Sequence, residues 1–342
     1  MPSVTAFQRL ATLLFLYQTY HCCCCWAILE AAVILPHGDF AYDPDLAQQN
    51  NGDFHAAQRL AAASRHVGHD FLEKTVQPDV IFVISPHGMA LSRDFGLYVG
   101  RQASGYVDIG NDLHPPHGTY RVHLNHVPLS PTLSLDLVKA LSAFNVSAIQ
   151  VSADNSRNTP LAWAEVIPLL LVNETVRRPH LIWSQPLRRL GPAAGADMVN
   201  ELLNMGNALF RWIQDRPERL AVLVSADLSH THRPDGPYGY APAAQAFDDS
   251  IQQWATGNPC NNAKYLLEIA TLLQPHALSC GYTGMVMLHG LLCGTHHDID
   301  YHDDDLPKWE SQVLVNTNVT YYGMMVAAMR RVKQRKSLRS VD

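Results

Sequence analysis

Two histidines follow the ends of two similar apolar segments. Ala32–Asp39, AVILPHGD, and Phe82–Met89, FVISPHGM, both stop at Pro-His-Gly. A short apolar, β-branched run bounded by Pro and Gly is typical of a buried strand, and Pro ends it because Pro cannot donate to the ladder. If both strands are parallel, His37 and His87 lie at the same edge of one sheet, where open α/β sheets place their sites. One such motif would favour a simple turn, but a matched pair favours a site for a divalent metal ion.

A third polar cluster follows another apolar run. The segment Ser225–His232, SADLSHTH, comes directly after RLAVLV. His230 is a candidate general base, because the pKa of an unperturbed imidazole lies near neutrality, and His232 competes with it for that role. Asp227 is a candidate for orienting an imidazole, with a helix or turn cap as an equally good interpretation.

The elements that must position these side chains begin with a βαβ unit. The sequence predicts a strand over Trp26–Leu35, a helix over Phe54–Lys74 capped by Asp53, and a strand over Val80–Ser85. The helix has apolar residues near helical spacing. A right-handed crossover makes the two strands parallel, so we expect both Pro-His-Gly turns at one sheet edge.

The remaining patterns extend this α/β arrangement. Further strands are expected over 120–127 (as an edge strand or hairpin arm), 147–151, 180–183, 220–224 and 319–329. Further helices are expected over 133–144, 160–172, 194–212, 243–255, 263–273 and 280–292. No low-complexity linker divides the chain, so we expect one domain from about 26 to 330 with a central mixed, mainly parallel sheet flanked by helices. Residues 1–25 form an extension before it, and 331–342 form a basic tail.

Composition excludes several classes of protein. The chain has 342 residues, 47% hydrophobic and 16% charged, with a net charge of -6, so we expect a substantial core and no basic surface for nucleic acid. No apolar run reaches the roughly 18–20 residues of a membrane span. Cys22–Cys25 are contiguous, and the other cysteines form no regular pattern that would predict a disulfide framework. We expect a cytoplasmic protein, with organelle targeting by residues 1–25 left open.

The order of these motifs resembles a known enzyme family. Strand-PHG, strand-SPHG, strand-SADLSH and a late Cys-Gly resemble the class III extradiol ring-cleaving dioxygenases of the LigB type, and are similar to their Memo-family relatives, over about residues 26–330. The resemblance implies a non-haem Fe(II) held by His37, His87 and one carboxylate. It also implies a catechol-type substrate that is opened next to its diol by O2, with His230 deprotonating the catechol. A homo-oligomer is compatible with this interpretation.

The third metal ligand departs from the family pattern. Where the family has its late carboxylate, this chain has His276-Ala-Leu-Ser-Cys280-Gly. Cys280 matches best, as in the Memo relatives, and a thiolate would make the site softer and tolerant of Zn or Cu. His276 is a further candidate, Glu268 is expected to be a surface charge, and a buried core thiol is the alternative interpretation of Cys280.

Three functions therefore compete. The first is an iron-dependent extradiol dioxygenase, the second a Memo-like metal-binding protein without ring-cleaving activity, and the third a zinc hydrolase. The sequence lacks a nucleophile elbow, which counts against the hydrolase. Trp163 stands where many ring-cleaving members have polar residues, and it is expected either in the core or stacked on an aromatic ring. The acidic, His-rich stretch 296–305 is expected to be a solvated loop.

Overall fold

The computed structural model describes residues 29–49, 52–110, 119–150, 158–172, 178–190, 197–294 and 308–332. The expected extension 1–25, the acidic stretch 296–305 and most of the basic tail lie outside these residues. Within them, one sheet has eight strands in the order β10-β11-β1-β9-β2-β8-β3-β6. Its strands are β1 (Leu29–Leu35), β2 (Val80–Ser85), β3 (Phe95–Tyr98), β6 (Val146–Ile149), β8 (His180–Ser184), β9 (Leu220–Ser225), β10 (Trp309–Asn318) and β11 (Gly323–Arg331).

The centre of the sheet is parallel. β9 pairs in parallel with β1 on one side and β2 on the other, and β2 pairs in parallel with β8. Leu35 aligns with Ser225, and Ile84 with Val224, so β1, β9 and β2 end together. β10 and β11 are antiparallel at one edge. The predicted α/β fold with a mixed, mainly parallel sheet is confirmed.

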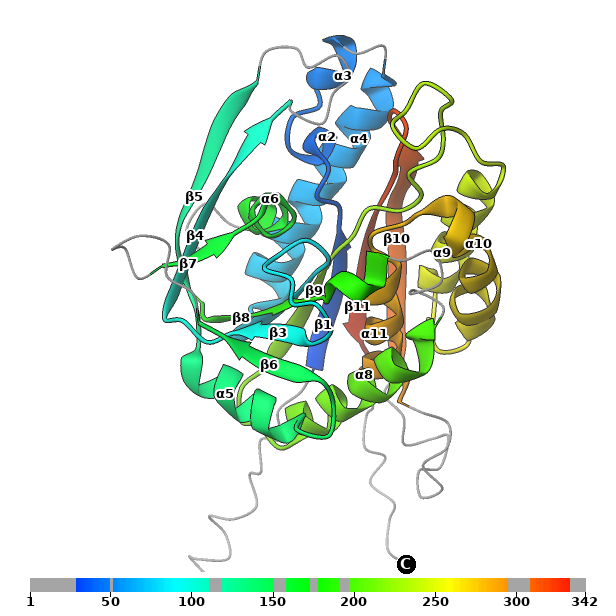
Figure 1. The fold of residues 1–342 in the computed structure, drawn as a ribbon. Coiled ribbons are helices and arrows are strands. Elements are labelled where there is room, and N and C mark those ends of the chain that lie inside the picture. The colour runs from blue at the N-terminus through cyan, green and yellow to red at the C-terminus, as the bar shows by residue number, and fades with distance from the viewer. Residues whose placement is uncertain are drawn as a thin grey trace, which may run out of the picture.

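Both faces of the sheet are buried, which explains why its central strands are almost continuously apolar. Ala32 and Ile34 of β1 belong to one core cluster, and Ala31 and Val33 to the other. The helices of the two layers flank the sheet (Figure 1). The first cluster includes residues of α8 (Val199–Gln214), α9 (Ala243–Ala255) and α11 (Tyr282–Cys293); the second includes residues of α4 (Phe54–Arg65), its π-helical continuation η1 (His66–Val76) and α6 (Trp163–Val172).

A small second sheet packs into the same core as α6. It has the order β5-β4-β7, so the segment 120–127 is an edge strand, as predicted. Its strands are β4 (Gln102–Ile109), β5 (Tyr120–Pro128) and β7 (Thr159–Leu161). The remaining elements are α2 (Asp39–Tyr42), α3 (Leu46–Gln49), α5 (Pro131–Ala140), η3 (Leu187–Leu190), η4 (Tyr265–Ala270) and α10 (Thr271–Ala277).

Most predicted elements occur with shifted ends. β2 and α9 have the predicted bounds, and Asp53 caps α4 by accepting a hydrogen bond of 2.9 Å from the amide of Ala56. The helix expected from residue 160 begins at Trp163, because Thr159–Leu161 pairs with β4 instead. β10 was not predicted, since its side chains are mostly half-buried and polar; β11 supplies its hydrogen bonds.

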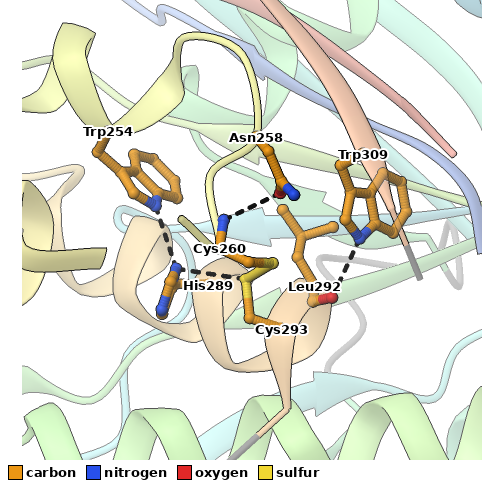
Figure 2. Close-up of a disulfide and its surroundings, with 7 residues drawn as sticks. All are labelled: Trp254, Asn258, Cys260, His289, Leu292, Cys293 and Trp309. Carbon is orange, nitrogen blue, oxygen red and sulfur yellow. Dashed lines mark hydrogen bonds between the residues drawn. A yellow bond between two sulfur atoms is a disulfide. The ribbon is translucent and has the colours of Figure 1, made fainter. Parts of the chain in front are cut away.

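A disulfide joins two cysteines whose spacing gave no signal. Cys260, in the turn after α9, bonds to Cys293 at the C-terminal end of α11, 33 residues away (Figure 2). His289 lies beside it, with Nδ1 3.6 Å from Cys293 Sγ and accepting a hydrogen bond of 3.1 Å from Trp254 Nε1. The irregular cysteine spacing therefore did not predict this bond, and a single bond is not a disulfide framework. The closed loop contains Cys280.

Candidate metal centre

The candidate ligands meet at the carboxyl ends of three neighbouring strands. His37 follows β1, His87 follows β2, Asp227 follows β9, and Cys280 comes just before α11. One donor atom each from His37, His87 and Cys280 lies within 4.8 Å of the others. The same limit holds for a second group formed by Asp227, His230 and Cys280. Because β9 lies between β1 and β2, distant parts of the chain reach a single point at the sheet edge.

The hydrogen bonds of His37 fix its tautomer. Its Nδ1 lies 2.9 Å from the hydroxyl of Ser225, and that hydroxyl donates to the carbonyl of Ala164. A serine hydroxyl has one proton, so it must accept from Nδ1–H of His37. The lone pair of the imidazole is therefore on Nε2. Burial, together with the nearby His87, His230 and Arg189, lowers the pKa of His37 well below its usual value, so the ring is neutral.

Two further side chains face this lone pair. Nε2 of His37 lies 3.3 Å from Cys280 Sγ and 3.3 Å from Oδ2 of Asp227. Nitrogen and sulfur bound to one tetrahedral metal ion, at about 2.1 and 2.3 Å, would lie about 3.6 Å apart. A neutral imidazole and a carboxylate have no proton to share at this contact, so a cation would relieve the repulsion between their lone pairs. The donor set therefore fits a metal ion.

His87 lies between a stacked ring and a guanidinium. Its ring stacks on Trp163 at a centroid distance of 4.9 Å and meets His37 edge-on at 5.2 Å. Nδ1 lies 3.2 Å from Nη2 of Arg189. Arginine only donates hydrogen bonds, so Nδ1 carries the lone pair in this arrangement. Burial, then Arg189 and His230, lower the pKa of His87 to about 3.

Both Pro-His-Gly glycines are needed for close side-chain packing. A Cβ on Gly38 would lie 2.3 Å from the ring of Tyr322, and one on Gly88 would lie 2.3 Å from Oε1 of Glu165. The two glycines admit the side chains that pack behind the two histidines.

The backbone around Cys280 brings its sulfur to the same centre. The amide of Gly281 and the hydroxyl of Ser279 both donate to the carbonyl of Asp227, over 3.1 and 2.9 Å. A Cβ on Gly281 would lie only 2.4 Å from the Cβ of Ala226. Burial, with the charge of Asp227, raises the pKa of Cys280 to about 12, so the thiol is protonated unless a cation binds.

The two candidate bases have different surroundings. His230 belongs to the group with Asp227 and Cys280 and stacks on Tyr238 at 5.6 Å. Burial, then His232, lower its pKa to about 4. His232 instead places Nε2 2.7 Å from Oδ2 of the buried Asp248, and it belongs to neither group of candidate ligands among the described residues.

The other sequence candidates lie elsewhere. Glu268 and His276 are exposed and belong to neither group of candidate ligands. Glu268 was expected to be a surface charge, whereas His276 was a candidate for the third ligand. Trp163 is not a core residue: its side chain is 43% exposed while it stacks on His87. It also lines a cavity of about 490 Å³ together with Asp39, Tyr106, Val107 and Leu161. That volume is in the range of sites for small molecules.

Three residues at the centre were missed by sequence reasoning. Ser225 ends β9 as Ser85 ends β2, so a polar residue at the end of an apolar run was the available signal. Glu165, buried in α6, accepts hydrogen bonds of 2.9 Å from the hydroxyl of Tyr98 and 2.7 Å from the amide of Ala162. Burial raises the pKa of Glu165 to about 8. Arg189 comes from the short helix η3, which carried no signal.

No helix in the described part of the chain has the length and apolar character to cross a membrane.

Comparison with known proteins places the chain in a family. The structure of the uncharacterized protein JW3007 from Escherichia coli K12 matches with a TM-score of 0.49 and 17% identity, covering 87% of this chain and 99% of that one. Protein CA_C1420 of Clostridium acetobutylicum is 23% identical over 269 residues, 78% of this chain and 52% of that protein, so the chain spans about half its length. The family model for the catalytic LigB subunit of aromatic ring-opening dioxygenase matches residues 32–312, and the chain belongs to this LigB family.

Proposed function

We propose that this protein is a non-haem Fe(II)-dependent extradiol dioxygenase, which uses O2 to open the ring of a catechol-type aromatic next to its diol. The observation that carries this proposal is that His37, His87 and Asp227 follow the ends of three neighbouring strands, and that His37 contacts both of the others. Two histidines and a carboxylate with open positions are the ligand set of non-haem Fe(II) oxygenases. Membership of the LigB family supports the same class of reaction.

Four side chains are available to hold the metal. We assign Nε2 of His37 and the imidazole of His87, with Asp227 or Cys280 as the third ligand. From the sequence alone Cys280 was the best match, with His276 as a further candidate, and the position of Asp227 adds a carboxylate that the late segment lacks. Iron bound there would orient catechol and O2 and couple them electronically.

His230 is the proposed base. Its ring lies beside Asp227 and Cys280 and is held by stacking on Tyr238. From this position a neutral imidazole could take the proton of a substrate hydroxyl at the centre. We assign His232 to positioning, because its Nε2 is engaged with Asp248.

Cys280 favours one alternative. Its sulfur is 3.3 Å from Nε2 of His37, and a thiolate ligand suits Zn or Cu better than it suits an oxygenase iron. A Memo-like metal-binding protein of the same fold, without ring-cleaving activity, is therefore the second candidate function.

The test is reconstitution of the full chain with Fe(II) without oxygen, followed by oxygen uptake with a panel of small catechols. The proposal expects iron binding, oxygen consumption and a yellow ring-fission product. Metal-loaded protein that consumes no oxygen and forms no yellow product with any catechol would favour the Memo-like alternative.

The third ligand is tested by paired variants. If Asp227 is the ligand, Asp227→Asn loses iron binding while Cys280→Ser retains it, and the reverse result assigns Cys280. Asp235→Asn is a matched control, because Asp235 is exposed in the same region of the chain and pairs only with Arg233 among the described residues. Metal content after gel filtration gives the readout.

A further inference from the structure

The disulfide joins two cysteines that differ in their exposure (Figure 2). Cys260 is half-buried in the turn after α9, whereas Cys293 is buried as the last residue of α11. Cys280, at the candidate metal centre, lies just before the other end of the same helix. A thiol that reacts with a disulfide attacks one sulfur and releases the other. A reductant from solvent meets Cys260 first, so Cys293 is the sulfur that leaves.

An imidazole that the proposed function does not use faces the leaving sulfur. Nδ1 of His289 lies 3.6 Å from Cys293 Sγ, one helical turn earlier in α11. The indole Nε1–H of Trp254 donates to the same Nδ1 over 3.1 Å, so this nitrogen carries no proton and acts as an acceptor. His289 is buried, and it belongs to neither group of candidate metal ligands among the described residues. When the disulfide is reduced, the thiol of Cys293 therefore has an acceptor already in place.

Contacts other than the disulfide hold the two cysteines near each other. The amides of Gly257 and Ser311 each donate to the other residue's carbonyl, over 2.9 and 2.7 Å, which ties the turn to β10. Trp309, also in β10, donates from Nε1 to the carbonyl of Leu292 over 3.0 Å at the end of α11 (Figure 2). Because β10 holds both the turn and the helix end, breaking the bond between the sulfurs leaves the two thiols within reach of one another.

The described part of the chain also contains a cysteine that is reduced. Cys280 is a buried free thiol, with its sulfur 3.3 Å from Nε2 of His37. A thiolate that binds a metal needs surroundings that keep thiols reduced, and in such surroundings a disulfide meets thiol reductants. A disulfide that opens and closes can coexist with Cys280, whereas a permanent staple suits the opposite conditions.

We propose that Cys260 and Cys293 form a reversible thiol–disulfide exchange site for a dithiol, with His289 as the proton acceptor of Cys293. The site lies outside the candidate metal centre and does not depend on the proposed function. Its output is the attachment of the turn after α9 to the end of α11, the helix that Cys280 precedes.

The exchange proceeds in two displacements. A thiolate of the dithiol attacks the sulfur of Cys260, the bond to Cys293 breaks, and Cys293 leaves as a thiolate. The proton lost by the attacking thiol reaches Cys293 through Nδ1 of His289. The second thiol of the reductant then displaces Cys260, which takes up that thiol's proton. Two electrons and two protons pass to the protein, and the reductant departs as a cyclic disulfide. Oxidation by a cyclic disulfide follows the same steps in reverse.

Reduction of the full chain by dithiothreitol, without denaturant and at neutral pH, tests whether the folded protein reacts. A maleimide quenches the reaction, and mass spectrometry of the peptides with Cys260 and Cys293 keeps the other cysteines out of the count. We expect a rate proportional to the concentration of dithiothreitol and insensitive to urea below the unfolding transition. We also expect the bond to form again in oxidised dithiothreitol. A rate that rises steeply with urea and does not depend on dithiothreitol would show that only the unfolded chain reacts, and would overturn the proposal.

His289→Gln tests the proton acceptor. Glutamine keeps an oxygen that can accept from Trp254, but it takes up no proton at neutral pH. We expect both reduction and reoxidation to slow about tenfold, because a thiol beside a proton acceptor ionises more readily. The reoxidation rate of the variant should keep rising with pH through about 8.5, where an ordinary thiol ionises, while the wild type is already fast at neutral pH.

His180→Gln is the matched control, because His180 is another buried histidine, in β8 on the other half of the sheet from β10. Its exchange rates and pH profile should match those of the wild type. Wild-type rates and a wild-type pH profile in His289→Gln would show that His289 does not handle the proton of Cys293, and would overturn that part of the proposal.

Discussion

The hydroxyl of Tyr98 donates a hydrogen bond of 2.9 Å to Oε1 of Glu165, and both groups are buried behind the second Pro-His-Gly turn. The same hydroxyl accepts a hydrogen bond of 2.8 Å from the amide of Met89, two residues after His87. The pair therefore joins α6 to the turn that carries one of the candidate metal ligands.

Removal of this hydroxyl should destabilise the protein and loosen the turn. Tyr98→Phe leaves the amide of Met89 and a carboxyl oxygen of Glu165 without their partner, at a cost of about 1–3 kcal/mol. We expect the free energy of urea unfolding to fall by that amount and metal affinity to fall with it. Tyr120→Phe is the matched control, because Tyr120 donates to Asp43 over 2.8 Å on the exposed surface. An equal loss in both variants would contradict the assignment.

Ser225 should matter for metal affinity more than for stability. Its hydroxyl holds the Nδ1–H tautomer of His37, and loss of such a supporting contact typically weakens metal binding about 10- to 100-fold. We expect this decrease for Ser225→Ala in competition with a chromogenic chelator. Ser250→Ala removes another buried serine hydroxyl, which donates to Phe247 within α9, and should leave metal affinity unchanged. Equal affinities of wild type and Ser225→Ala would show that His37 does not bind through Nε2.

The strand ends could be predicted because their signal is local. Each apolar run stops at a Pro-His-Gly or at Ser-Ala-Asp, and the chemistry of Pro and Gly fixes where a strand ends. That placed His37, His87 and Asp227 at one edge of the sheet. The position of β9 between β1 and β2 could not be derived from these runs, since the pairing joins segments about 190 residues apart, as the bond from the amide of His37 to Asp227 illustrates.

Other features of the site depend on tertiary contacts without a local signal. Arg189 lies in four residues of η3, too few for any periodic pattern. Glu165 in an apolar helix reads as an isolated charge until its partner Tyr98 is known. The bond between Cys260 and Cys293 connects residues that are 33 positions apart, and spacing alone does not predict such a pair.

His180 should make the protein less stable in acid. Burial lowers the pKa of His180 to about 4 from a usual 6.5, so the unfolded chain binds a proton that the folded protein does not. Its contribution to stability is complete above about pH 6.5 and is lost progressively as the pH falls toward 4. The shift corresponds to roughly 3 kcal/mol at 1.36 kcal/mol per pH unit.

A replacement that cannot be protonated isolates this contribution. His180→Phe should lose less unfolding free energy than the wild type between pH 7.5 and pH 4, measured by urea titration at each pH. His55→Gln changes an exposed histidine of α4 and should follow the wild-type curve. Parallel curves for His180→Phe and the wild type would show that His180 does not carry this pH dependence.

The bond between Cys260 and Cys293 should stabilise the part of the chain that presents Cys280. It closes a loop of 33 residues that contains α10, Cys280 and α11, and a loop of that length is worth roughly 3–4 kcal/mol through the entropy of the unfolded chain. We expect dithiothreitol to lower the free energy of unfolding by about this amount. The double variant Cys260→Ser, Cys293→Ser should show the same loss without reductant and no further loss with it. Because the tethered segment also positions the Cys280 sulfur 3.3 Å from Nε2 of His37, metal affinity should fall together with stability. A double variant that is as stable as the oxidised wild type would show that the disulfide contributes nothing to stability in solution.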